Sequence, residues 1–120
     1  LTMDNYKKIN LEFLQSFTQN DNAQMAKYIN MFLTLAPVSI NTMKTQHECG
    51  DWNNLRTTAH SLKPQLAYMG IESLKETILR IEEYAGEAKN PEAIGGLIQT
   101  VEAGCNEAFV ELRAVIEKIA

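Results

Sequence analysis

The fold is decided by the stretch Ala59-His60-Ser61-Leu62-Lys63-Pro64-Gln65-Leu66-Ala67-Tyr68-Met69-Gly70. Together with a leucine just before it, apolar residues recur at steps of three and four, at Leu55, Ala59, Leu62, Leu66 and Met69. This spacing is typical of the buried face of an amphipathic helix. We therefore expect a central helix from about residue 52 to residue 69, ended by a left-handed glycine at position 70.

His60 lies on the outer side of this predicted helix. A helix advances by about 100° per residue, so His60 points about 140° away from Leu55, into solvent. Arg56 and Lys63 lie four residues before and three residues after His60, which makes them its neighbours on the helix surface. We therefore expect His60 to lie beside two cations and no carboxylate. The other neighbours expected on this side are Thr57, Pro64 and Ala67.

These residue types suit a phosphate acceptor. A neutral imidazole is a nucleophile near neutral pH and exposes a ring nitrogen. Arg56 and Lys63 would stabilise a phosphoryl group on His60, and the small Ala67 would leave room for a partner protein. An exposed histidine on a helix usually has no chemical role, so the residues alone leave both interpretations open.

The pattern of Ala59-His60, Lys63 three residues later and Gly70 ten residues later resembles the signature of histidine-containing phosphotransfer (HPt) domains. Helix order and spacing extend the resemblance from about Leu11 to the C-terminus. It implies that His60 accepts a phosphoryl group from the aspartate of a response-regulator receiver domain and passes it to another receiver. It also implies that Lys63 is the nearby cation and that Gly70 ends the helix.

The sequence departs from the family pattern at Pro64, where glycine is usual, and at Gln65, where a small residue is usual. These departures concern partner docking more than the acceptor. We expect docking through Thr57, Pro64, Ala67 and Tyr68. The alternative is a helical interaction module that resembles HPt domains but has lost phosphotransfer. The presence of both His60 and Lys63 favours the phosphocarrier.

Composition and charge narrow the class of protein. The 120 residues suit one domain, residues 1–120, with one core. The net charge of −4 does not favour nucleic-acid binding. No apolar run is long enough for a membrane helix and no signal peptide is visible, so we expect a cytoplasmic protein without membrane contact. Its two cysteines, Cys49 and Cys105, are expected to be reduced.

Catalytic and metal motifs are lacking in the sequence. It has no glycine-rich nucleotide loop, so we expect a phosphocarrier without kinase activity rather than an enzyme. His47 and Cys49 have no second cluster to complete a metal site, and His47 is interpreted as a solvated surface residue. We expect no cofactor, with Mg²⁺ held by the receiver partner. The expected partners are a receiver domain and a sensor or hybrid histidine kinase.

Helical periodicity covers nearly the whole chain, and strand patterns are almost absent. We therefore expect an all-α protein: an antiparallel four-helix bundle with one or two additional short N-terminal helices. Residues 1–9 are weakly patterned and would form a frayed arm or an extra helical turn. Asn10, Asp21 and Asp51 are expected helix caps, and Gly50 is expected to close the helix before Asp51.

Two prolines fall within the helical pattern. Pro37 indicates either a kink or the start of a new helix. Pro64 deprives the His60 carbonyl of its hydrogen bond and crowds it, so we expect a kink there.

The two C-terminal helices complete the pattern. The acidic residues between positions 72 and 83, Glu82 among them, are interpreted as a solvated face. Asn90-Pro91 begins the last helix, whose heptad stripe either packs within the bundle or forms a coiled-coil dimer. We favour the bundle and a monomer, because the other helices have apolar faces to cover.

Overall fold

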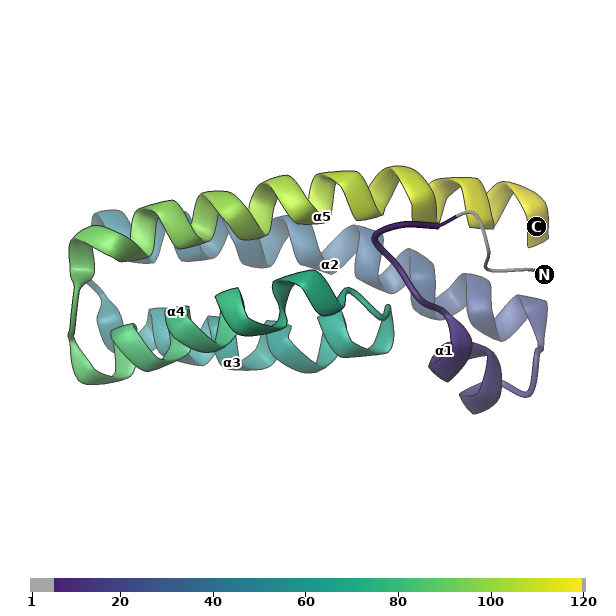
Figure 1. The fold of residues 1–120 in the computed structure, drawn as a ribbon, viewed down its shortest axis with the longest axis horizontal. Coiled ribbons are helices and arrows are strands. Elements are labelled where there is room, and N and C mark those ends of the chain that lie inside the picture. Colours follow the sequence, from purple (N-terminus) through teal and green to yellow (C-terminus); the bar gives the residue numbers. More distant parts are fainter. Residues whose placement is uncertain (1–5, 120) are drawn as a thin grey trace.

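The computed structural model describes residues 6–119 as a set of helices without a strand in that range (Figure 1). The elements are α1 (Glu12–Phe17), α2 (Asn22–Glu48), α3 (Trp52–Tyr68), the 3-10 turn η1 (Glu72–Leu74), α4 (Lys75–Glu87) and α5 (Pro91–Ile119). The all-α prediction is confirmed. The predicted central helix is also confirmed to within one residue at its C-terminal end.

Four helices form an elongated bundle of 43 × 21 × 20 Å. The long helices α2 and α5 pack against each other along the molecule, and α3 and α4 cover one half of that pair (Figure 1). The short helix α1 lies beyond the ends of α3 and α4, at the other half (Figure 1). The predicted four-helix bundle is confirmed, and one short N-terminal helix lies within the described residues.

The predicted apolar stripes form the core. The stripe from Leu55 to Met69 is buried, as are the apolar residues of the next stripe, Ile71, Leu74, Ile78, Ile81 and Ala85. The heptad stripe of α5 is buried at Ile94, Ile98, Val101, Cys105, Ala108, Leu112 and Val115, whereas its last member, Ile119, is half-buried. Burial raises the pKa of the Cys105 thiol to about 12. The heptad stripe of α5 is therefore covered within the bundle rather than left for a coiled-coil partner.

Most predicted helix ends are confirmed. Asp21 accepts a hydrogen bond from the backbone N–H of Gln24 at 3.1 Å, and Asp51 accepts one from Asn54 at 3.4 Å. Gly50 and Gly70 have φ values of +67° and +65°, as left-handed residues after helices do. Asn10 accepts a hydrogen bond from Glu12, although α1 begins one residue later than expected, with Leu11 in the cap position.

Neither proline ends its helix. Pro37 lies inside α2 and Pro64 inside α3, so the alternative of a new helix starting at Pro37 is wrong. The cost of a proline in a helix interior is about 3 kcal/mol. Burial of apolar side chains on both sides of each proline, such as Leu62 and Leu66 in α3, offsets this cost. The bend expected at Pro64 stays a prediction.

The described part of the N-terminal arm is neither frayed nor helical. Residues 1–5 of the expected arm lie outside the described residues. The backbone N–H groups of Lys7, Lys8 and Ile9 all donate to the carboxylate of Glu111 on α5, at 2.9, 2.9 and 3.1 Å. Ile9 is also buried. The expectation was wrong here because a distant carboxylate and a core position, neither visible in local pattern, hold the arm on the bundle.

Candidate functional site

His60 lies on the outer face of α3, with its side chain 66% exposed. The preceding residue, Ala59, is fully buried, which fixes the direction in which the helix presents the imidazole. The helix itself is held between α2 and α4. The exposure that the spacing predicted for His60 is therefore observed, and it rests on a rigid element rather than a loop.

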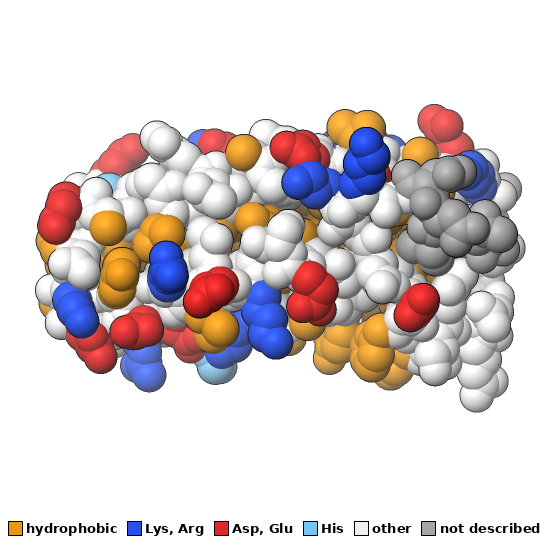
Figure 2. Space-filling view, viewed as in Figure 1, with side chains coloured by type: hydrophobic (Ala, Val, Ile, Leu, Met, Phe, Trp, Pro, Cys, Tyr) orange, Lys and Arg blue, Asp and Glu red, His pale blue; other side chains and the backbone are white. Residues whose placement is uncertain are grey.

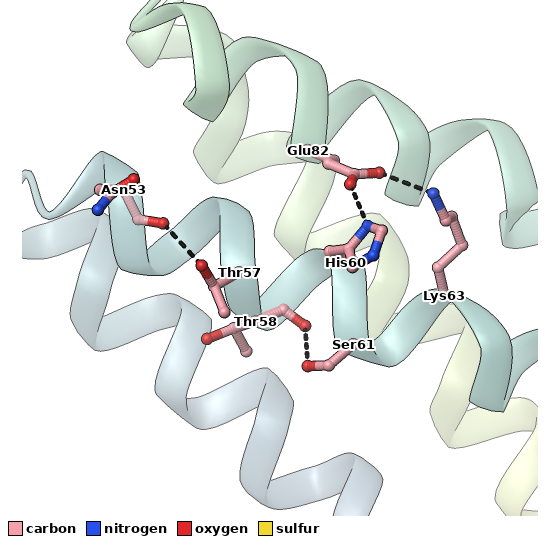
Figure 3. Close-up of polar contacts among 7 residues, drawn as sticks. All are labelled: Asn53, Thr57, Thr58, His60, Ser61, Lys63 and Glu82. Atoms are coloured by element: carbon pink, nitrogen blue, oxygen red, sulfur yellow. Dashed lines mark hydrogen bonds and ion pairs between the residues drawn. The ribbon is translucent and has the colours of Figure 1, made fainter.

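A carboxylate from the neighbouring helix contacts the imidazole. Glu82 of α4 places one oxygen, Oε2, on Nδ1 of His60 and the other, Oε1, 3.0 Å from Nζ of Lys63 (Figure 3). The expectation of two cations without a carboxylate is therefore wrong. It considered neighbours on α3 only, whereas α4 packs beside α3 and brings in a residue 22 positions later in the chain.

The environment of Glu82 favours its ionised form. Partial burial by itself raises the pKa of this carboxyl group. The hydrogen bonds from Lys63 and His60 and the positive charge of Lys63 lower the pKa by more than burial raises it, so the net pKa lies below the usual range. The Glu82 side chain is only 17% exposed. The interpretation of this residue as part of a solvated face is thus wrong, although Glu76 and Glu83 nearby are exposed.

Arg56 precedes His60 by one turn of α3 and lies against α4. Its side chain runs against Gly86, where an added β-carbon would lie 2.9 Å from the Arg56 Cδ atom. Gly86 follows Glu82 by one helical turn. The cation that the structure joins to His60 through Glu82 is therefore Lys63, and Arg56 is a more distant neighbour on an exposed part of α3.

Hydroxyl groups beside His60 are engaged by their own helix. Thr57 donates to the carbonyl of Asn53 at 3.2 Å, and Ser61 donates to that of Thr58 at 3.0 Å (Figure 3). These bonds leave Glu82 as the polar side chain that contacts the imidazole in the described part of the chain. The site therefore consists of an exposed imidazole, a carboxylate on Nδ1 and a lysine on that carboxylate.

The model of the Hpt domain family matches residues 27–120. The chain belongs to the Hpt domain family. No curated protein and no solved structure matches it. Hpt domains transfer phosphoryl groups through a histidine in phosphorelays, act as phosphocarriers without kinase activity, and interact with receiver domains and histidine kinases. The matched residues include the whole of α3, α4 and α5.

In this Hpt domain, the residues expected to dock a partner lie on the exposed surface of α3. Pro64 and Ala67 line a groove between α3 and α4, together with Lys63. Tyr68 is 51% exposed, and its ring stacks on that of Phe13 from α1 at 5.5 Å between centroids. The structure therefore places these three residues on the half of α3 that follows His60, whereas Thr57 precedes it.

An apolar pocket adjoins the C-terminal end of α3. Its volume is about 290 Å³, and Phe13, Tyr68 and Gln65 are among its lining residues, with others from α2. Figure 2 shows hydrophobic side chains gathered on the lower edge of the molecule, in the region of α1. Gln65, one of the two departures from the family pattern, therefore lies at the wall of this pocket, while Pro64 lies on the other side of the helix.

The other histidine is not the solvated residue that was expected. His47 is half-buried, its ring lies 5.9 Å from that of Trp52, and its Nε2 lies 3.3 Å from the carbonyl oxygen of Pro91. It packs on Gly95, where a β-carbon would lie 3.1 Å from the ring. Within residues 6–119, no three His, Cys, Asp or Glu side chains are placed to hold a metal ion, and none of the helices there could cross a membrane.

Sequence reasoning missed Glu82, although the helical pattern holds a signal for it. Glu82 directly follows buried Ile81 and lies four residues after buried Ile78, which places it about 40° from Ile78 around the helix. Residues at the border of a buried stripe face the neighbouring helix rather than open solvent. Among the acidic residues of α4, Glu82 therefore lies at the border of the buried stripe, whereas Glu76 and Glu83 lie on the exposed side of the helix.

Proposed function

We propose that His60 is the phosphoacceptor of this Hpt domain. It would receive a phosphoryl group from the phosphorylated aspartate of a receiver domain and pass it to the aspartate of another. The observation that carries the proposal is the exposed imidazole of His60, whose Nδ1 contacts Glu82 while no described residue is hydrogen-bonded to Nε2 (Figure 3). The family of the chain supports the same reaction.

The proposed step is a phosphoryl transfer between two protein side chains. The lone pair of Nε2 attacks phosphorus, the bond between phosphorus and the aspartate oxygen breaks, and the aspartate leaves as a carboxylate. Transfer to the next receiver is the reverse of this step. The Hpt domain needs no nucleotide for either direction, and we expect the receiver to hold the Mg²⁺ ion that stabilises the transferred group.

The role proposed for Lys63 is electrostatic. Lys63 lies within one helical turn of His60 and its side chain is 35% exposed, so it is accessible to a phosphoryl group placed on the imidazole. A cation positioned beside such a group stabilises its negative charge. Arg56, which lies against Gly86, would add a weaker and more distant positive charge.

The proposed docking surface surrounds His60 on α3. Pro64, Ala67 and Tyr68 follow the histidine, and Thr57 precedes it by one turn. Apolar and aromatic side chains are enriched at the centres of protein interfaces, and the stacked rings of Tyr68 and Phe13 provide such an area at the C-terminal end of α3, about two helical turns after the acceptor. A receiver domain that covers these residues would bring its aspartate to Nε2 and exclude water from the transferred group.

The test is incubation with a phosphorylated receiver domain and Mg²⁺, followed by intact-mass analysis. The expected product carries one added phosphoryl mass that is acid-labile and alkali-stable, as a phosphohistidine is. The matched control is His47→Gln, which changes the other histidine of the chain and should still be phosphorylated. Loss of the added mass in His60→Gln but not in His47→Gln would establish His60 as the acceptor.

The second candidate function is a helical interaction module that binds receivers without phosphotransfer. Pro64 and Gln65 favour it, since both depart from the family pattern and line surface hollows on the half of α3 that follows His60. Failure of transfer from several phosphorylated receivers, with binding retained, would support this alternative. Pro64→Gly would then test whether the proline is the cause, because restored transfer would assign the defect to docking rather than to His60.

A further inference from the structure

The apolar pocket at the C-terminal end of α3 has walls built largely of aromatic rings. Phe13 and Phe17 come from α1, Tyr28 from α2 and Tyr68 from α3. The rings of Phe13 and Tyr68 are nearly parallel, with an angle of 8° between their planes, whereas Phe17 meets Tyr28 edge to face at 75°. Phe13, Phe17 and Tyr68 are each more than half exposed. The pocket is therefore accessible from solvent and offers both ring faces and ring edges to an occupant.

One polar group in the wall of this pocket lacks a partner. Gln65 lines the pocket, and its amide nitrogen Nε2 donates to the carbonyl of Ser61 at 3.2 Å. The amide oxygen Oε1 is buried and has no hydrogen-bond partner within the described part of the chain. A buried acceptor without a partner is unfavourable, because it has lost its hydrogen bonds to water. The terminal torsion of a glutamine is broad, so the amide can turn this oxygen toward an occupant that brings a donor.

We propose that this pocket binds a small, flat aromatic molecule that carries one hydrogen-bond donor. The ring of the ligand lies among the aromatic side chains of α1, α2 and α3, and its N–H or O–H group donates to Oε1 of Gln65. Aromatic rings prefer offset-stacked or edge-to-face neighbours, and the walls present both orientations. An apolar lining with a few polar groups that orient the ligand is the common form of a small-molecule site.

The size of the pocket limits the ligand to one or two fused rings. Its volume is about 290 Å³, whereas a cavity of about 150 Å³ is enough for one benzene ring. An aliphatic side chain of a protein partner could fill part of the same volume, but it would leave Oε1 of Gln65 unpaired. The unpaired oxygen therefore favours an aromatic ligand with a donor over an aliphatic group.

Indole and benzofuran are the matched probes for this site. Both have the same bicyclic shape, but indole carries an N–H donor and benzofuran has a ring oxygen in its place. Each is titrated into the isotope-labelled full chain and followed by NMR, which gives both the affected residues and the dissociation constant. We expect indole to cause saturable shifts at Phe13, Gln65 and Tyr68, with little change at Trp52, which begins α3 at its other end. Lack of saturable binding of indole would overturn the inference.

The decisive quantity is the ratio of the dissociation constants of benzofuran and indole. A hydrogen bond of ordinary net strength corresponds to about fivefold in affinity, so this ratio should be about fivefold larger in the wild type than in Gln65→Leu. Gln46→Leu is the matched control, because Oε1 of Gln46 is also buried and unpaired within the described residues but lies outside the pocket lining. Its ratio should equal that of the wild type. Equal ratios in all three proteins would overturn the inference.

The wild type alone also tests the proposal if a variant does not fold, since indole should bind to it more tightly than benzofuran. A side chain of a receiver domain is the other candidate occupant. If a receiver shifts the pocket residues while indole and benzofuran bind with equal affinity, the pocket belongs to a protein interface and the inference is overturned. None of these measurements involves phosphoryl transfer, so their outcome is independent of whether His60 is the acceptor.

Discussion

The backbone of Asn10 passes directly against Gly70. A β-carbon at Gly70 would lie 2.0 Å from the carbonyl oxygen of Asn10 and 2.6 Å from its nitrogen. The backbone N–H of Asn10 also donates to the carbonyl of Met69 at 3.2 Å. The glycine that ends the acceptor helix is therefore also the point where the N-terminal arm crosses α3, immediately before α1.

Gly70→Ala should destabilise the protein for two reasons. The residue has a φ of +65°, which costs a non-glycine residue about 1–2 kcal/mol, and the arm would have to move away from the new methyl group, at a further cost of about 1–3 kcal/mol. Thermal unfolding measures the sum. Gly96→Ala is the matched control, because Gly96 lies inside α5 with open space around it. That change should stabilise the protein by up to about 1 kcal/mol. Equal effects of the two changes would contradict this account.

His60→Gln should abolish phosphoryl uptake and leave the fold nearly unchanged. The side chain is mostly exposed, and its contact with Glu82 is that of a surface pair, which contributes about 0–1 kcal/mol to stability. Circular dichroism and thermal unfolding check the fold, and intact-mass analysis checks the uptake. A large fall in the melting temperature would instead indicate that His60 is a structural residue.

The stability contributed by Glu82 should depend on pH. Its pKa is lowered in the folded state, so its contribution is fully present above the pKa of the unfolded chain, about 4.3. It is lost as the pH falls through the lower pKa of the folded state. The difference in unfolding free energy between wild type and Glu82→Gln should therefore shrink as the pH falls below about 4. Chemical denaturation at neutral and acidic pH measures it, with Glu83→Gln as the control. A difference that stays constant with pH would disprove the linkage.

The sequence predicted the elements well because their signals are local. The stripe that includes Leu55 and Leu62 has the helical period, and Asp51 and Gly70 are residue types that begin and end helices. The Glu82 contact and the Glu111 contacts with the arm were missed because they join residues far apart in the chain. The continuity of α2 through Pro37 was left open, since it depends on core packing that local propensity does not contain.

The effects of Lys63 and Glu82 on transfer should not be additive. Lys63 holds one oxygen of Glu82 at 3.0 Å, so Lys63→Ala loses both the cation beside the phosphoryl group and the anchor of the carboxylate. We expect slower uptake and a shorter phosphohistidine lifetime in Lys63→Ala. In the double variant Lys63→Ala with Glu82→Ala, the fold-loss in uptake rate should be smaller than the two single-variant fold-losses multiplied together. Strict additivity would mean that Lys63 acts on the phosphoryl group alone.

Glu111 should hold the N-terminal arm on the bundle. Its carboxylate accepts from three consecutive backbone N–H groups, those of residues 7–9, and hydrogen bonds to a charged group contribute about 1.5–3 kcal/mol each when they are intact. Glu111→Gln removes the charge and leaves one acceptor oxygen, so amide exchange of Lys8 and Ile9 should become at least about tenfold faster. Glu107→Gln is the control, because Glu107 pairs only with the Lys8 side chain in the described contacts, at 3.2 Å. Equal protection in the two variants would show that burial of Ile9, rather than the carboxylate, fixes the arm.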